Sequence, residues 1–127
     1  MSNRFSVKKR IVSFKHAFRG IAEVLRSQHN AWIHTTATVI VVIAGIYFQV
    51  TRLEWCWLVA AMAFVWVAEA FNTALENLAD AVVKDVDPLI GKAKDIAAGA
   101  VLIAAAGAAI IGLLILGPYI INLISRF

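Results

Sequence analysis

Residues 53–80 read LEWCWLVAAMAFVWVAEAFNTALENLAD, and the rest of the chain can be understood from this segment. Its first part, up to Ala68, is almost uncharged and contains nothing that breaks a helix. Polar side chains then recur at helical spacing, and they are Glu69, Asn72, Glu76 and Asp80. At about 100° per residue, these four lie within about 80° of one another on one side of a helix. The segment therefore predicts a membrane-spanning helix whose acidic stripe, defined by these four residues, begins inside the apolar part.

Glu69 is the residue of the acidic stripe that most needs an explanation. A carboxylate in hydrocarbon is costly, so it is expected to face protein or water and to mark a functional site. A solvated face on a helix that has already left the bilayer would account for Asp80 and in part for Glu76. It does not account for Glu69, which directly follows the apolar run. We therefore interpret the stripe as a functional site.

The composition indicates a membrane protein with little mass outside the lipid. The chain has 127 residues, which is the size of one domain, so we treat residues 1–127 as a single integral-membrane domain. It is 61% hydrophobic and only 16% charged, with a mean hydropathy of +0.80, whereas soluble domains are about a quarter charged. The single cysteine, Cys56, lies in an apolar run and excludes an intrachain disulfide.

The N-terminal segment 4–28 predicts an amphipathic helix. Apolar residues recur at spacings of three and four, and basic residues occupy the other faces. Such a helix is expected to lie in the membrane interface, with its basic side against anionic lipid headgroups. Nucleic acid is not expected as a partner. The apolar positions are Val7, Ile11, Phe14, Phe18, Ile21 and Leu25.

Three further segments predict membrane helices, at 33–50, 55–83 and 88–116. Asp87 and Pro88 are typical of an N-cap and a first helical residue. Gly117–Pro118 is expected to break or kink the last helix. The predicted fold is therefore an all-α membrane protein, with an N-terminal amphipathic surface helix and three transmembrane helices.

The distribution of basic residues predicts the orientation in the membrane. Seven of the 12 Lys and Arg residues precede residue 30, and three more lie in the segment 84–94, whereas the turn at 51–54 carries only Arg52. The positive-inside tendency then places the N-terminus and the second loop in the cytoplasm. The end of the acidic stripe would meet Lys94 and Asp95 on the side of the membrane where ATP is available.

These residue types are suited to phosphoryl transfer at a membrane surface. Glu69 could act as a general base toward the hydroxyl of an amphiphile. Glu76 could hold Mg²⁺ on a phosphate chain, and Lys94 could pair with the phosphates. An interfacial charge pair at a helix start would explain Lys94 and Asp95 equally well. No Walker-type or glycine-rich phosphate loop occurs in the sequence, which argues against a soluble kinase fold.

Two spaced motifs resemble a known family. The first is Glu69-x-x-Asn72-Thr-Ala-x-Glu76-x-x-x-Asp80, and the second is Gly91-x-Ala-Lys94-Asp95-x-x-x-Gly-Ala-Val-Leu102. Together they resemble the small bacterial integral-membrane diacylglycerol kinase family, which includes the undecaprenol kinases. The resemblance covers nearly the whole chain. Asn30 with Ile33–His34, together with the segment Asp95-Ile-Ala-Ala-Gly-Ala100, is more similar to the undecaprenol kinase branch.

The resemblance implies an ATP-dependent and Mg²⁺-dependent lipid kinase of the bacterial inner (cytoplasmic) membrane. It would phosphorylate the hydroxyl of a membrane lipid alcohol, diacylglycerol or undecaprenol, at the cytoplasmic interface, and would form a homotrimer. By position, Glu69 would be the catalytic base and Glu76 a metal ligand close to the nucleotide. Asn72 and Asp80 would support the site, and Lys94 and Asp95 would contact the nucleotide.

Three positions depart from the family pattern. Gln28 stands where a second, acidic metal ligand is usual, and a glutamine offers only a neutral carbonyl oxygen. His16 stands where tyrosine is common, and Trp32 where a basic residue is common. Because of Gln28, the sequence does not decide whether residue 28 binds the metal. Because of His16 and Trp32, it does not decide which nucleotide or lipid contacts form near the surface helix.

Two other classes of function remain open from the residues alone. One is a small proton-coupled transporter that uses Glu69 as its proton-binding carboxylate. The other is a catalytically silent membrane subunit, for which Gln28 is the only support. Transfer of labelled phosphate from ATP to a lipid alcohol would separate these classes from a kinase.

Gln28→Glu tests the metal position. If residue 28 is a metal ligand, the added carboxylate should lower the Mg²⁺ concentration needed for half-maximal phosphorylation. The measurement is a Mg²⁺ titration of the rate at fixed ATP, beside the unchanged chain. An unchanged Mg²⁺ requirement would remove residue 28 from the metal site.

Overall fold

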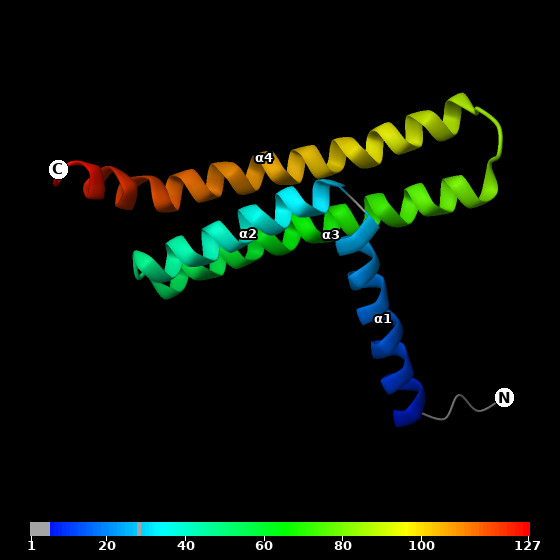
Figure 1. Cartoon of the computed structure of the whole chain (residues 1–127), viewed down its shortest axis with the longest axis horizontal. Helices are drawn as coiled ribbons and strands as arrows, with labels where there is room; N and C mark the ends of the chain where they lie inside the picture. The colour runs from blue at the N-terminus through cyan, green and yellow to red at the C-terminus, as the bar shows by residue number, and fades with distance from the viewer. Residues whose placement is uncertain (1–5, 28) are drawn as a thin grey trace.

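The computed structural model describes residues 6–27 and 29–127, so Gln28 lies outside the described residues. The described chain is all-α, as predicted (Figure 1). The last three of its helices are long and apolar enough to cross a membrane, and the first is a shorter N-terminal helix. The helices are α1 (Val7–Ser27), α2 (His29–Tyr47), α3 (Arg52–Val82) and α4 (Pro88–Ile124).

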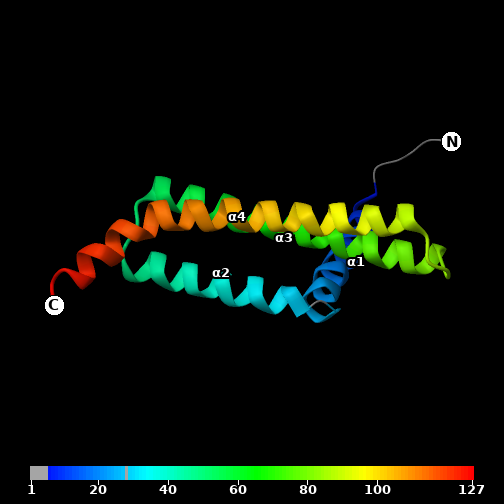
Figure 2. The ribbon, with the colours of Figure 1, turned by 90° about the horizontal axis from the view of Figure 1, so that it is seen from above.

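Several helix boundaries differ from the expectation. Helix α2 (His29–Tyr47) both begins and ends earlier than the predicted segment 33–50. Helix α3 already begins at Arg52, because Thr51 and Glu54 form a capping box that makes the polar turn part of the helix. Helix α4 does not end at residue 116 but continues through Pro118 to Ile124. A proline removes one N–H donor, and long membrane helices tolerate this with a local adjustment. Figure 2 shows the C-terminal part of α4 leaving the line of the rest of the helix.

At the other end of α4, Asp87 is the N-cap, as predicted, and accepts hydrogen bonds from the amides of Leu89 and Ile90.

A tight turn joins α2 to α3. The amide of Val50 donates to the Gly45 carbonyl (3.1 Å), and that of Gln49 donates to the Ile46 carbonyl (3.2 Å). Gln49 has φ = 52°, the left-handed conformation typical of this helix termination. Thr51 caps α3 directly afterwards. The turn therefore reverses the chain with almost no linker.

The three long helices lie side by side, with α3 along α4 and α2 against both (Figures 1 and 2). Near the α2–α3 turn, Val50, Leu58 and Leu116 form a buried cluster. Tyr119 stacks on Phe48 there and donates a hydrogen bond to Glu54 (2.9 Å). These contacts hold the three helices together at this end.

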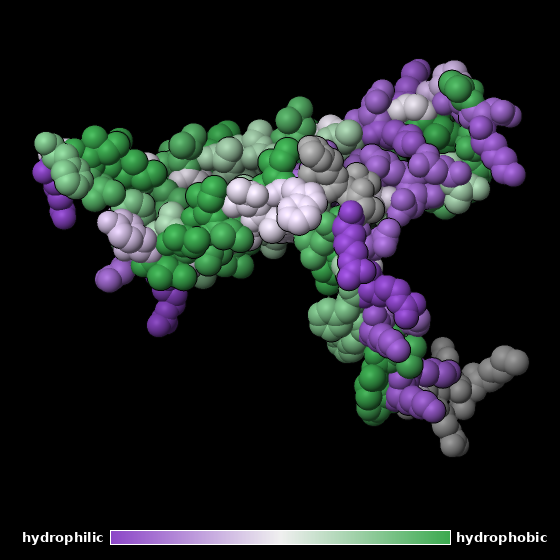
Figure 3. Space-filling model, viewed as in Figure 1, coloured by the Kyte–Doolittle hydropathy of each residue, from purple (hydrophilic) through white to green (hydrophobic). Residues whose placement is uncertain are grey.

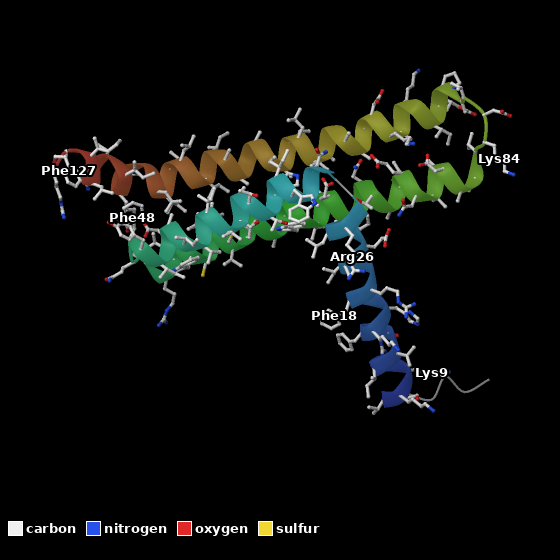
Figure 4. The ribbon with its side chains drawn as sticks, in the orientation of Figure 1. Lys9, Phe18, Arg26, Phe48, Lys84 and Phe127 are labelled. Carbon is white, nitrogen blue, oxygen red and sulfur yellow. The ribbon has the colours of Figure 1, made fainter. Side chains whose placement is uncertain are left out.

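The surface divides into an apolar region and a polar end. Most large apolar side chains of α2, α3 and α4 are exposed, as expected for helices that face lipid. In Figure 3 hydrophobic surface covers these helices, and hydrophilic surface gathers where α3 passes into α4. Lys84 lies at this polar end, and Phe48 and Phe127 lie at the other (Figure 4).

Helix α1 runs across the direction of the long helices (Figure 1). Its apolar stripe is exposed; Phe14 and Phe18, for example, are 65% and 68% accessible. Phe18 and Lys9 lie on opposite sides of the helix (Figure 4). The hydrophilic side of α1 faces the same way as the polar end of α3 and α4 (Figure 3). An amphipathic helix of this kind is suited to a membrane surface.

Gly45→Ala tests the packing of the α2–α3 turn. A Cβ at residue 45 would lie 2.6 Å from the Trp55 ring, so we expect overpacking to cost about 1–3 kcal/mol. The measurement is the midpoint of thermal unfolding in detergent micelles. Gly107→Ala is the matched control, since nothing lies within 4 Å of that position. Equal midpoints for both variants would contradict this account of the turn.

Candidate functional site

The carboxylate of Glu69 is the centre of the candidate site. Glu69 is completely buried in α3, immediately after the apolar run that predicted its importance. Its Oε2 lies 3.6 Å from Nε2 of His34 on α2. Neither carboxylate oxygen has a hydrogen-bond partner among the described residues. A buried carboxylate without hydrogen bonds is destabilising, so its presence needs a functional reason.

His34 is positioned by contacts between α2 and α3. Its ring makes an edge-to-face contact with Trp66, at 6.2 Å between centroids. The indole Nε1 of Trp66 donates a hydrogen bond to Thr38 Oγ1 (3.1 Å), one turn further along α2. This interhelical hydrogen bond fixes α2 against α3 and directs His34 toward Glu69. Sequence reasoning did not assign His34 a role, and a histidine just inside a membrane span was the signal that could have done so.

Asn72 and Glu76 form a second polar pair on α3. Asn72 Nδ2 donates to Glu76 Oε1 at 3.1 Å. The amide oxygen of Asn72 and the hydroxyl of Thr73 are buried without a hydrogen-bond partner in the part of the chain that the structure describes. Asn72 therefore orients the carboxylate of Glu76 and keeps one acceptor oxygen free.

The end of the acidic stripe meets α4 at Lys94. Lys94 Nζ donates to Asp80 Oδ1 at 2.7 Å, with both side chains partly in solvent. Asp95 is the next residue on α4 and is exposed. The expected meeting of the stripe with Lys94 therefore occurs, and it links the polar ends of α3 and α4.

Two cavities adjoin the site, and His34 lines both. The polar cavity, of about 240 Å³, is lined by His34, Asn72 and Glu76, with Asn30 and an apolar wall from α4. The apolar cavity, of about 440 Å³, extends from His34 along α2, α3 and α4 as far as Ile120. Glu69 lines neither cavity. The carboxylate therefore lies behind the wall that His34 forms.

The oxygen atoms of the polar cavity suit a hard cation better than a transition metal. No cluster of three His, Cys, Asp or Glu side chains that could hold a metal occurs among residues 6–27 and 29–127. The cavity offers the carboxylate of Glu76, held by Asn72. Mg²⁺ prefers oxygen ligands and commonly needs only one or two carboxylates besides substrate phosphates. These residues therefore fit Mg²⁺ bound together with a phosphate chain.

The structure brings together some predicted site residues and separates others. Glu69, Asn72 and Glu76 follow one another along α3, and Lys94 with Asp80 lies beyond them toward the α3–α4 turn. His16 and Trp32 are exposed, and Trp32 borders a shallow apolar cavity on α2. The predicted metal ligand Gln28 falls outside the described residues.

Comparisons with known proteins show what the sequence is similar to. The family model described as prokaryotic diacylglycerol kinase matches residues 15–116. The undecaprenol kinase of Bacillus subtilis is 39% identical over 106 residues, which cover 84% of this chain and 86% of that protein. The diacylglycerol kinase of Synechocystis sp. is 36% identical over 114 residues, which cover 89% of this chain and 65% of that protein. The matched region thus covers most of the first relative and about two thirds of the second.

Glu69→Met tests whether the buried carboxylate lowers stability. Methionine has a similar shape and needs no hydrogen bond, so we expect the free energy of unfolding to rise by about 1–3 kcal/mol. Thermal unfolding in detergent micelles measures this change. Glu54→Met, on the same helix, is the control. It should lower the midpoint, because Glu54 is hydrogen-bonded to Thr51 and Tyr119. A fall in stability for Glu69→Met would mean that Glu69 is a structural residue.

Proposed function

The chain belongs to the prokaryotic diacylglycerol kinase family, and from this premise we propose how its residues transfer a phosphoryl group. Family membership makes the protein a multi-pass membrane lipid kinase that phosphorylates diacylglycerol or undecaprenol with ATP as the donor. It also favours a kinase over the proton-coupled transporter and the silent subunit that the residues alone left open. The site residues, the metal ion and the oligomer are our proposal.

Glu69 is the final acceptor of the proton that the lipid hydroxyl loses. The buried carboxylate, which accepts no hydrogen bond from the described residues, is the observation that carries this assignment. Its oxygens accept no hydrogen bond from the described residues, so they are available to accept a proton. The proton would arrive from the cavity side, where His34 and Asn72 stand.

The phosphate chain of ATP binds between the polar cavity and the α3–α4 turn. Glu76, oriented by Asn72, would hold Mg²⁺ on the phosphates. The bound cation would neutralise the charge that develops on the phosphoryl oxygens. Lys94, kept in place by Asp80, would pair with the phosphates, and Asp95 would contact the nucleotide. Gln28 would offer at most a neutral oxygen ligand.

The two cavities suggest where the lipid lies. Its hydrocarbon would follow the apolar cavity along α2, α3 and α4, and its hydroxyl would enter the polar cavity at His34. Diacylglycerol and undecaprenol both present one hydroxyl to the interface and hydrocarbon to the bilayer. The two relatives carry names for one lipid each, so the acceptor is one of these two.

Helix α1 supports an orientation with the site at the cytoplasmic surface. Its exposed apolar stripe and basic residues suit an interface rich in anionic headgroups. α1 joins the bundle close to the start of α2, and His34 with Glu69 lies at that level. With α1 in the cytoplasmic interface of a bacterial inner membrane, the polar ends of α3 and α4 would extend toward cytoplasmic ATP. The homotrimer is a further part of the proposal, and it is supported by the family resemblance.

Glu69→Gln tests the assignment of the proton acceptor. The change keeps the shape of the side chain but removes the basic group, so phosphorylation should fall by about 100-fold or more. Labelled phosphate transfer from ATP is measured in mixed micelles, with diacylglycerol and undecaprenol side by side. Glu54→Gln, at the other end of α3, is the control and should retain activity. Turnover by Glu69→Gln near the wild-type rate, in protein that inserts normally, would exclude Glu69 as the acceptor.

A further inference from the structure

Glu69 has no direct access to the cavity in which the lipid hydroxyl would bind. Both carboxylate oxygens are buried, and Glu69 lines neither cavity. His34 lines both cavities and retains 13% side-chain exposure. Its Nε2 faces the carboxylate at 3.6 Å and has no hydrogen-bond partner among the residues described. The imidazole therefore stands between the cavity and the carboxylate.

We propose that His34 carries the proton from the lipid hydroxyl to Glu69. This inference rests on the proposed function and adds a second residue to the reaction. Imidazole is suited to the step because it can accept a proton at one ring nitrogen and donate one from the other. The pair follows the logic of other catalytic groups in which a carboxylate orients and stabilises a histidine.

The proton transfer balances in the following way. The lipid O–H bond breaks as its oxygen forms a bond to the terminal phosphorus of ATP, and the P–O bond to ADP breaks. The proton of the hydroxyl moves to the ring nitrogen of His34 on the cavity side. The proton on Nε2 moves to Glu69 Oε2. The products are the phosphorylated lipid, ADP, a protonated Glu69 and His34 in its other tautomer. Because Glu69 is buried, its proton returns to Nε2 of His34 as the cavity-side nitrogen releases a proton to water, which restores both groups.

The surroundings of His34 favour this route over one through another group. From α3, His34 meets Glu69 and the ring of Trp66, and Glu76 lies across the polar cavity, where Asn72 holds it. From α4, only apolar side chains line the two cavities around it. No described side chain of α1 lines either cavity. Among the described residues, His34 is the titratable group that both lines the polar cavity and lies 3.6 Å from the Glu69 carboxylate.

His34→Gln separates proton transfer from positioning. Glutamine keeps an N–H that can hold Glu69 in place, but its amide cannot accept the proton. We expect His34→Gln and His34→Leu to lower kcat alike, by about 100-fold or more, with KM for ATP and lipid changed less than about threefold. Thr35→Val is the matched control on the next residue of α2. Among the described residues its hydroxyl donates to the Ala31 carbonyl of its own helix, so kcat should be retained.

Chemical rescue gives a second readout that a structural role would not produce. In His34→Ala, added imidazole should restore part of kcat, because it can enter the enlarged cavity and carry the proton. The same addition to Glu69→Gln should restore nothing. Thermal unfolding in detergent accompanies each variant, so that a misfolded protein is recognised and the rescue experiment decides.

The outcomes distinguish this inference from the proposed function. If His34→Gln turns over within about threefold of wild type while Glu69→Gln is inactive, the proton does not pass through His34 and only the relay is wrong. An equal loss of kcat in Thr35→Val, or no rescue of His34→Ala by imidazole, also overturns the relay. If Glu69→Gln itself remains active, both the relay and the proposed role of Glu69 as proton acceptor are wrong.

Discussion

A carboxylate held in a membrane helix without hydrogen bonds is the constraint on which this structure depends. Removing a charge from water costs several kcal/mol even after relaxation, so the fold must either neutralise Glu69 or give it a partner. The partner of Glu69 is His34, which lies on α2 and is positioned by the hydrogen bond between Trp66 and Thr38. The close packing of α2 on α3 therefore serves the site as well as stability.

The polar groups that stabilise the bundle and those of the candidate site lie in different parts of it. Near the α2–α3 turn, a capping box, a left-handed residue and the Glu54–Tyr119 hydrogen bond satisfy the polar groups. At the other end, His34, Glu69, Asn72 and Thr73 carry unpaired buried atoms. Unsatisfied groups are rare in stable cores, and a concentration of them is typical of sites that must bind and react.

His34 lies where two environments meet. The apolar cavity that begins beside it can hold hydrocarbon, and the polar cavity on its other side is continuous with the acidic stripe that leads to Lys94. A kinase that joins a lipid to a nucleotide needs such a boundary, since its substrates do not share a solvent. Helix α1 lies at the same level of the bundle, where a bilayer would have its surface (Figure 1).

The sequence by itself determined the helices and the stripe. Periodic apolar residues and membrane-length runs specify α1 to α4, and four polar residues on one face mark the candidate site on α3. The sequence did not determine that α4 passes through Pro118, because neighbouring packing decides whether a membrane helix tolerates a proline. Nor did it assign His34 to Glu69, because these residues lie on different helices and only the α2–α3 packing sets their distance. Residue spacing shows which side chains share a face within one helix, whereas the tertiary structure determines which faces of different helices are in contact.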